Sequence, residues 1–396
     1  MTDATRDACI TGIGIITCLG EGPETTWQKL ASGEFKVDDK TYAPFSVHPL
    51  GPVDFDKQIP KKGDQRQMEA WQRIGTYAAG LALDSAGLKG NAEILSRTDM
   101  IVAAGGGERD TAVDTTILSA MPTTNDPDKL LNEKLMSDLR PTLFLAQLSN
   151  LLAGNIPIVH GVTGSSRTFM GEEAAGVNAV RIAVSRINAG QSEVALVGGS
   201  YNADRKEMLM LFEFASSLLR GGHAGVWDRG ERGGLAPGSL GAFLVIESRA
   251  HAEKRGAKIL ARVSDVMAER PKRTAHSVTS ALQQMWQRIA KKIDKNHAAV
   301  LSGATGAEPA TREEREFLQG LGGLPVRTTA TYIGQALEAQ FVVNVAIAAI
   351  ALGHGNLFPP HDKSGLEQPM SGSLKQVVVT SVGYWRGEGM ALIEAA

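Results

Sequence analysis

Short apolar segments alternate with helix-length segments along the whole chain, and this alternation constrains the fold more than any other feature. Residues 8–16 read as a buried strand, residues 66–87 as a long amphipathic helix closed by Gly87, and Met100–Ala104 as another strand. Further short apolar segments occur at 242–247, 257–267, 298–302, 325–329 and 376–380. Strands that alternate with helices predict an α/β fold.

The chain divides most naturally at the charged stretch Glu247–Lys258. We therefore expect a larger half, residues 1–250, and a smaller half, residues 251–396, each of α/β type. The nearly all-apolar segment Phe341–Leu352 predicts a helix buried in the core, because a helix that is apolar all round has no face for water.

Composition excludes several classes of function. The net charge of −2 over 396 residues is not that of a general nucleic-acid or membrane-surface binder. We expect no signal peptide, since Met1 to Ala8 is polar and charged, and no membrane span, since no apolar run reaches roughly 20 residues. The two cysteines, Cys9 and Cys18, are too few for a disulfide framework and lack the spacing of metal ligands. A cytoplasmic protein without a metal or cofactor is expected.

Several segments, in the same order along the chain, resemble the elongating β-ketoacyl carrier-protein synthases of the thiolase superfamily. They are ITGIGIITCLGEGPETTWQKLASGE (10–34), NLLAGNIPIVHGVTGSSRTFMGEEAAG (150–176), INAGQSEVALVGGS (187–200), LVIESRAHAEKRGAKILARV (244–263) and IALGHGNLFPPH (350–361). The resemblance implies a five-layered αβαβα fold of two similar halves, a dimer, and acyl chains delivered on an acyl carrier protein.

The family's chemistry requires a cysteine at a helix N-terminus and two histidines. The cysteine takes the acyl chain as a thioester, and the histidines assist decarboxylation and stabilise the enolate oxygen. Counted without gaps from Asn150, or back from Gly198, the cysteine position falls on Glu173. The histidine positions fall on Gly303 and Gln335. We therefore expect none of the three positions to be catalytically competent, and a carboxylate at Glu173 to repel a malonyl anion.

Two further stretches depart from the synthase pattern. The segment Glu172–Gly176 is similar to the Glu-Gln-Ala-Gly-Gly of chain-length factors, the partner subunits of polyketide synthases, with Glu173 in place of the glutamine. The family's glycine-rich loop is replaced by residues 383–388, where Trp385 and Arg386 are expected to fill space beside the acyl entrance. The resemblance also implies a group of substrate-binding positions: Thr305, Ala330, Gly383, Tyr384 and Trp385.

Three hypotheses follow. The preferred one is a non-catalytic partner that forms a heterodimer with a complete ketosynthase and shapes the tunnel that measures acyl length; a homodimer is the alternative assembly. The second is a divergent 3-oxoacyl carrier-protein synthase or decarboxylase that acts by itself, with a resemblance to synthases of very-long-chain fatty acids for lipid A. The third is a module that only binds the acyl carrier protein. The sequence leaves open whether the protein is an enzyme.

Overall fold

The strands of the protein are hydrogen-bonded side by side in one continuous order. The computed structural model describes residues 4–140, 143 and 147–396. Across these residues the strand order is β4-β3-β5-β6-β1-β7-β11-β10-β8-β9, with β2 added beside β1. The strands are β1 Ala8–Thr17, β2 Gly20–Glu21, β3 Asp99–Ala103, β4 Ser166–Phe169, β5 Val194–Tyr201, β6 Leu240–Ser248, β7 Ala261–Glu269, β8 Ala298–Ser302, β9 Val326–Thr328, β10 Gln376–Val382 and β11 Glu388–Glu394.

The strand order is the same in the two halves of the chain. Read from the outer edge inwards, the first half runs β4-β3-β5-β6-β1 and the second half runs β9-β8-β10-β11-β7. The halves meet where β1 and β7 pair antiparallel, with Cys9 opposite Arg262 and Ile10 opposite Ala261. The predicted fold of two similar α/β halves is thereby confirmed. A domain boundary at residue 250 lies between β6 and β7, and its role as the limit of an independent unit stays a prediction.

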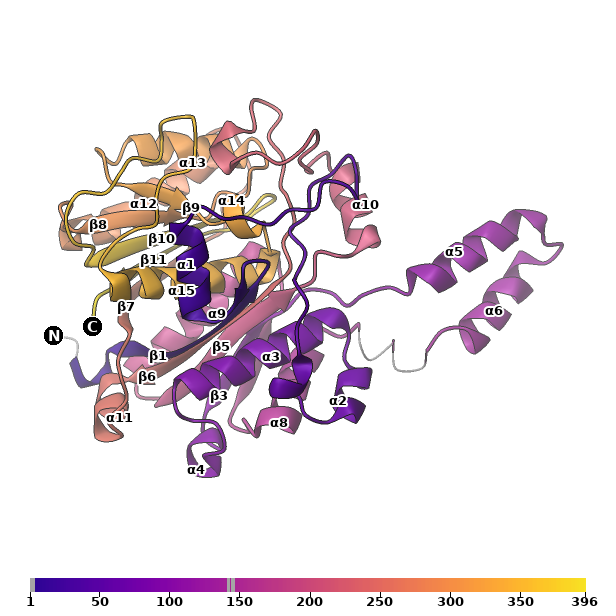
Figure 1. The fold of residues 1–396 in the computed structure, drawn as a ribbon, viewed down its shortest axis with the longest axis horizontal. Helices are drawn as coiled ribbons and strands as arrows, with labels where there is room; N and C mark the ends of the chain where they lie inside the picture. The colour runs from indigo at the N-terminus through magenta and orange to yellow at the C-terminus, as the bar shows by residue number, and fades with distance from the viewer. Residues whose placement is uncertain (1–3, 141–142, 144–146) are drawn as a thin grey trace.

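Helices complete the layers (Figure 1). Helices α9 and α15 pack between the strands of the two halves, α3 and α8 cover the outer face of the first half, and α12 and α13 cover that of the second. The α-helices are α1 Pro23–Ala31, α2 Lys62–Gln67, α3 Ala70–Ser85, α4 Ala92–Leu95, α5 Thr111–Ala120, α6 Pro127–Ser137, α8 Leu151–His160, α9 Glu173–Asn188, α10 Lys206–Phe214, α11 Arg249–Lys254, α12 Ser277–Ile289, α13 Ala310–Gln319, α14 Ala330–Ile333 and α15 Gln340–His354.

Two of these elements differ from the sequence-based expectation. The single helix expected over 66–87 is two helices, because Met68 is extended (φ −93°, ψ 136°) and Glu69 starts α3 through a reciprocal capping box with Gln72. Strand β11, with the sequence EGMALIE, was not expected. It pairs along its whole length between β7 and β10.

The central layer explains the most apolar part of the sequence. In α15, every residue from Gln340 to Leu352 is buried. Within the described residues, the window Leu337–His354 is long and apolar enough to cross a membrane by length and composition alone, with mean hydropathy 1.5, but 89% of it is buried inside the protein. This helix is therefore accounted for as the core helix predicted at 341–352.

Close packing on the outer face of the first half depends on glycine. A Cβ atom at Gly14 of β1 would lie 2.0 Å from the carbonyl oxygen of Ala78, and one at Gly12 would lie 2.5 Å from that of Ala82. Helix α3 therefore rests directly on the backbone of β1, which only glycine allows.

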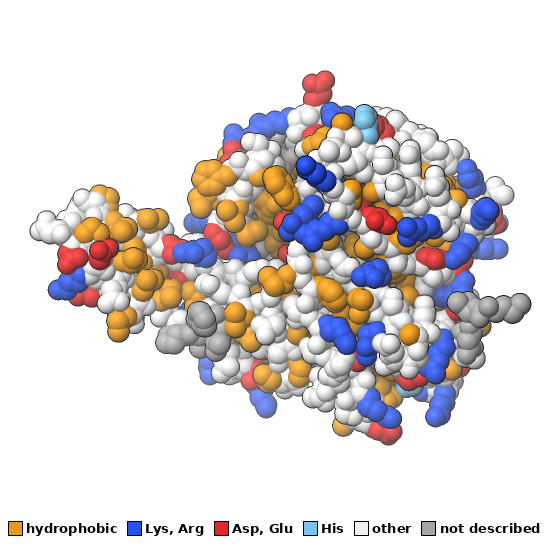
Figure 2. Space-filling model, turned by 180° about the vertical axis from the view of Figure 1, so that it is seen from behind, with side chains coloured by type: hydrophobic (Ala, Val, Ile, Leu, Met, Phe, Trp, Pro, Cys, Tyr) orange, Lys and Arg blue, Asp and Glu red, His pale blue; other side chains and the backbone are white. Residues whose placement is uncertain are grey.

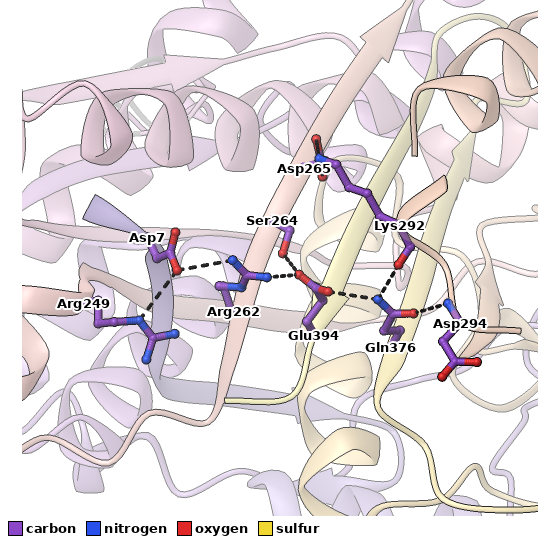
Figure 3. Close-up of polar contacts among 9 residues, drawn as sticks. All are labelled: Asp7, Arg249, Arg262, Ser264, Asp265, Lys292, Asp294, Gln376 and Glu394. Carbon is purple, nitrogen blue, oxygen red and sulfur yellow. Dashed lines mark hydrogen bonds and ion pairs between the residues drawn. The ribbon is translucent and has the colours of Figure 1, made fainter. Parts of the chain in front are cut away.

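A row of polar contacts crosses the junction of the two halves (Figure 3). Its nine members are Asp7, Arg249, Arg262, Ser264, Asp265, Lys292, Asp294, Gln376 and Glu394. Arg262 bridges the halves, because it binds Asp7 at 3.3 Å and also contacts Glu394 of β11. Partly exposed ion pairs contribute at most about 1 kcal/mol each, so this row orients the chain ends more than it stabilises them.

Helices α5 and α6 form a hairpin that projects from the body, and we call residues 111–137 the arm (Figure 1). None of the residues of α6 is buried. Hydrophobic side chains lie along the arm (Figure 2), with Leu118 67%, Leu135 43% and Met136 79% exposed. The arm thus presents apolar surface that the described part of this chain does not cover.

Candidate functional site

The turn between β4 and α9 places Glu173 inside the protein. Glu172 has φ 58° and ψ −143°, a conformation that is costly for any residue except glycine, and Gly171 before it has φ 121°. This sharp turn lets α9 begin at Glu173, whose side chain is 1% exposed. A strained residue at the head of a buried helix is typical of a functional site, and here it directly precedes the position that matches the family cysteine.

Glu173 and Gln335 are in direct contact. Gln335 Nε2 donates to Glu173 Oε1 at 3.1 Å, and the backbone N–H of Tyr384 donates to the same oxygen at 3.4 Å. Glu173 Oε2 finds no hydrogen-bond partner among the described residues. Gln335 is itself held by its backbone, which bonds Ala236 O at 2.8 Å. The positions matched to the family's cysteine and second histidine therefore lie together.

The environment of Glu173 favours the neutral form of its carboxyl. Burial raises the pKa of Glu173 to about 8, while its own backbone N–H, that of Tyr384 and the Gln335 amide act in the opposite direction. The charge of Glu172 adds to the increase. At pH 7 the protonated acid therefore predominates. The raised pKa bears on the expected repulsion of a malonyl anion, because only the ionised acid carries a charge, and that repulsion stays a prediction.

Gly303 leaves no room for an imidazole. It follows β8, and its N–H donates to Thr380 Oγ1 at 3.0 Å. A Cβ atom at this position would lie 2.5 Å from the carbonyl oxygen of Thr380 and 2.7 Å from Ser381 Cα. The backbone of β10 therefore occupies the space that a side chain at Gly303 would need.

Glu314 is a second buried acid that the sequence-based reasoning missed. It is 0% exposed, and its Oε1 accepts from Thr380 Oγ1 at 2.5 Å and from Ser302 Oγ at 2.9 Å. Burial raises the pKa of Glu314 to about 7. The two hydroxyls and the Gly303 N–H act to lower this pKa, and the charge of Glu388 acts to raise it. A signal existed in the sequence: Glu314 stands four residues after Ala310 and three before Phe317, on the apolar face of α13.

The 383–388 loop closes over Glu173 and is held by Arg273. Arg273 donates to the carbonyl oxygens of Gly383 at 2.6 Å and Trp385 at 3.1 Å, and it forms an ion pair with the buried Glu388. Trp385 is 62% exposed, and the expectation that it fills space beside the acyl entrance stays a prediction. Arg386 reaches towards Glu172, with Nε 3.7 Å from Oε2.

A cavity of about 470 Å³ lies beside this loop. Tyr384 and Trp385 line it, as do Arg273 and His276. Two other expected substrate-binding residues are placed elsewhere. Thr305 is 1% exposed and its hydroxyl accepts from Ala307 N at 3.1 Å, and Ala330 belongs to the outer core of the second half.

Both cysteines hydrogen-bond backbone carbonyl oxygens, not Glu173. Cys18 Sγ donates to Tyr332 O at 3.4 Å, and Cys9 Sγ donates to Asp7 O at 3.6 Å. Burial raises the pKa of both thiols, to about 12 for Cys18 and about 11 for Cys9, so neither forms a thiolate readily. Within the part of the chain that the structure describes, no three His, Cys, Asp or Glu side chains are grouped to hold a metal ion.

Comparison with known proteins shows the family of the chain. Residues 5–252 match the sequence model of the family described as β-ketoacyl synthase, N-terminal domain. The 3-oxoacyl-[acyl-carrier-protein] synthase 2 of Vibrio cholerae is 25% identical over 268 residues, which are 65% of this chain and 62% of that protein. The synthase 2 of Rhizobium meliloti is 25% identical over 385 residues, 90% of this chain and 88% of that protein.

Solved structures share the fold over nearly the whole chain. The ishigamide ketosynthase/chain length factor superposes with a TM-score of 0.80 at 18% identity, covering 99% of both chains. A β-ketoacyl synthase from Burkholderia phymatum gives 0.76 at 18% identity, covering 98% of this chain and 99% of that one. A type II polyketide ketosynthase solved with its acyl-carrier protein gives 0.74 at 19% identity, with the same coverage. The expected thiolase-like architecture is confirmed, and the chain belongs to the β-ketoacyl synthase family.

Proposed function

We propose that this chain is a non-catalytic subunit that pairs with a complete β-ketoacyl synthase, in the manner of a chain-length factor, and helps to build acyl chains on a carrier protein in fatty-acid or polyketide synthesis. The contact between Glu173 and Gln335 carries the proposal. At the two matched positions a buried acid bonds an amide, and neither group forms a thioester or acts as an imidazole.

The magnitude of the loss supports a non-catalytic role. Removal of one acid–base group or one oxyanion donor commonly lowers a rate by about 10²- to 10⁴-fold. Here the nucleophile and both histidines are replaced together, and Gly303 lacks the space to regain a side chain. Condensation by this chain alone is therefore not expected. The fold shared with the ishigamide ketosynthase/chain length factor agrees with this role.

The arm and strand β4 support pairing with another subunit. Leu118 and Met136 of the arm are exposed to solvent. Soluble monomers rarely leave large contiguous apolar patches exposed. Strand β4 ends the strand path of the first half and bonds only β3 among the described strands. A free strand edge and an apolar hairpin are both surfaces that another subunit covers.

Co-expression with a cysteine-bearing synthase tests the pairing. We expect a 1:1 heterodimer, and we expect Leu118→Glu with Met136→Glu to weaken it at least tenfold, because both charges enter an apolar contact. The matched control adds the same two charges at exposed positions of α12, Gln283→Glu with Gln287→Glu, and leaves the heterodimer intact. Recovery of homodimers only would contradict the proposal.

A decarboxylase that acts alone is a second candidate, and the neutral state of Glu173 favours it. A protonated acid does not repel malonate, so a malonyl group can approach it. Purified protein with malonyl carrier protein is assayed for release of CO₂. The preferred function predicts only background release. Release that disappears in Glu173→Ala but persists in Cys18→Ala establishes the decarboxylase instead.

A carrier-binding module is the third candidate, and the cavity beside the 383–388 loop favours it. Its wall includes the exposed Trp385, which offers a flat apolar surface for a thioester-linked chain. This function predicts that the isolated chain binds an acyl carrier protein and that Trp385→Ala weakens binding. Binding that appears only after a synthase is added favours the partner subunit.

A further inference from the structure

A second cavity, of about 670 Å³, lies outside the Glu173 site. It is bordered by the short helix η4, Val226–Asp228, by the residues that follow it, and by the first turns of α13. Six charged or polar side chains in its wall carry the argument: Trp227, Arg229, Glu231, Glu308, Arg312 and Arg315. Its volume falls within the ordinary range for small-molecule sites, about 300–1,000 Å³.

Two buried donors in this wall have no acceptor. Trp227 is 3% exposed and Arg229 is 9% exposed. Trp227 Nε1 and Arg229 Nη2 find no hydrogen-bond partner among the described residues. The rest of the Arg229 guanidinium is bonded, with Nε donating to Ala224 O at 3.1 Å and Nη1 to Gly234 O at 2.7 Å. A buried donor without an acceptor is destabilising, so the wall favours a ligand that brings acceptors.

The wall also concentrates positive charge. The guanidinium of Arg315 lies over the Trp227 ring, 5.6 Å from its centroid, and bonds Trp227 O. Arg312 is exposed one turn earlier on α13. Glu231 and Glu308 partly offset the three arginines, and one Glu308 oxygen already accepts from Arg312 N at 3.3 Å. Burial raises the pKa of Glu308 above its ordinary value.

We propose that this cavity binds the phosphate group of a small molecule. Three arginine side chains and the Trp227 indole line it, and guanidinium groups match phosphate oxygens well. Phosphate offers more acceptor oxygens than a carboxylate does for donors that come from several directions. Because the two unpartnered nitrogens are covered, binding requires the side chains over them to shift, and the emission of Trp227 reports that shift.

Titration at constant ionic strength tests the site, with tryptophan fluorescence and the melting temperature as readouts. One series uses inorganic phosphate and the other uses glycerol 3-phosphate. We expect a saturable response to phosphate in the intact chain. Tighter binding of glycerol 3-phosphate identifies an organic phosphate as the ligand, and equal affinity identifies free phosphate.

Variants locate the response. Arg315→Gln and Trp227→Phe are expected to weaken binding at least tenfold. Arg312→Gln, at an exposed position, keeps the test valid if a buried variant fails to fold. Arg288→Gln on α12 is the control, since its side chain is 61% exposed and lies outside the cavity. The proposal is overturned by no saturable response in the intact chain, or by equal binding in Arg312→Gln, Arg315→Gln and the control.

Discussion

Gln335 donates its side-chain amide to the carboxyl of Glu173 at 3.1 Å, although 162 positions separate the two residues in sequence. The bond joins the first residue of α9 to the segment that follows α14. An amide that bonds a neutral acid forms a pair with no net charge, so a fully buried site tolerates it without a counter-ion. The pair is therefore compatible with the apolar centre of the fold.

Glu173→Gln is expected to change how stability depends on pH. The folded-state pKa of about 8 is above the ordinary 4.5, so the folded protein holds more protons than the unfolded chain between these values. Stability is therefore fully present below about pH 4.5 and is lost towards pH 8, by at most about 1.4 kcal/mol per pH unit. Glutamine cannot ionise, so this loss should disappear in the variant.

Urea unfolding between pH 5 and 9 measures the difference. Relative to the original chain, Glu173→Gln should gain stability with rising pH, on the order of 4 kcal/mol by pH 8 to 9. Glu253→Gln changes the same residue type where the side chain is 62% exposed, and it should run parallel to the original chain. If the free energy of unfolding of Glu173→Gln and of the original chain changed with pH in the same way, Glu173 would already be ionised in the folded protein at pH 5.

Gly303→Ala is expected to destabilise the protein by about 1–3 kcal/mol, because the added methyl group overlaps the backbone of Thr380 and Ser381. Gly353→Ala is the matched control within α15, where a Cβ meets nothing within 4 Å. It should stabilise the protein by about 0.5–1 kcal/mol, as alanine usually does in a helix. Thermal unfolding measures both, and a neutral Gly303→Ala would mean that this position can accept a side chain.

Arg273→Lys is expected to loosen the 383–388 loop. Lysine keeps the charge near Glu388 but lacks the planar donors that reach Gly383 and Trp385 together. Hydrogen–deuterium exchange should become faster in residues 384–387. Arg288→Lys, which alters an exposed ion pair to Glu269, should leave that exchange unchanged. Unaltered protection in Arg273→Lys would mean that the loop is held by other contacts.

His48→Gln is expected to reduce sensitivity to acid. Burial lowers the pKa of His48 to about 3, and the charges of His223 and Arg229 act in the same direction. The ring stays neutral in the folded protein while the unfolded chain gains a proton below about pH 6.5. Stability therefore falls between pH 6.5 and 3 by at most about 1.4 kcal/mol per pH unit, and the variant should lose part of that slope.

Unfolding experiments from pH 7 to 4 measure the slope, with His297→Gln as the control because His297 lies at the exposed end before β8 and bonds Ser373 O. A slope that is the same for the original chain and His48→Gln would locate the acid sensitivity elsewhere.

The sequence predicted the strands well where apolar residues cluster. Residues 298–302 form β8 as expected, and the segments at 242–247 and 376–380 lie inside β6 and β10. The break between α2 and α3 was missed because the amphipathic pattern continues through Met68, while the capping box that starts α3 is a local hydrogen-bonding preference. Hydrophobic periodicity records which face is buried and does not record where the backbone leaves the helix.

Site residues could be predicted only where a family motif could be aligned with this sequence residue by residue. The contact between Glu173 and Gln335 follows from motif positions far apart in the chain. Glu314 was missed because its buried state depends on hydroxyl groups of Ser302 and Thr380, which no local pattern connects. The arm was missed for another reason: a helix whose apolar residues face outwards has the same sequence pattern as one that packs on a body.

The antiparallel pairing of β1 with β7 limits how this molecule can change shape. A hinge between the halves would have to break main-chain hydrogen bonds at Ile10 and pull apart the ion pairs of Arg262. Large opening motions of the two halves are therefore disfavoured. Conformational changes are therefore expected in the arm and in the short loop over Glu173. The paired strands of the two halves are expected to stay rigid.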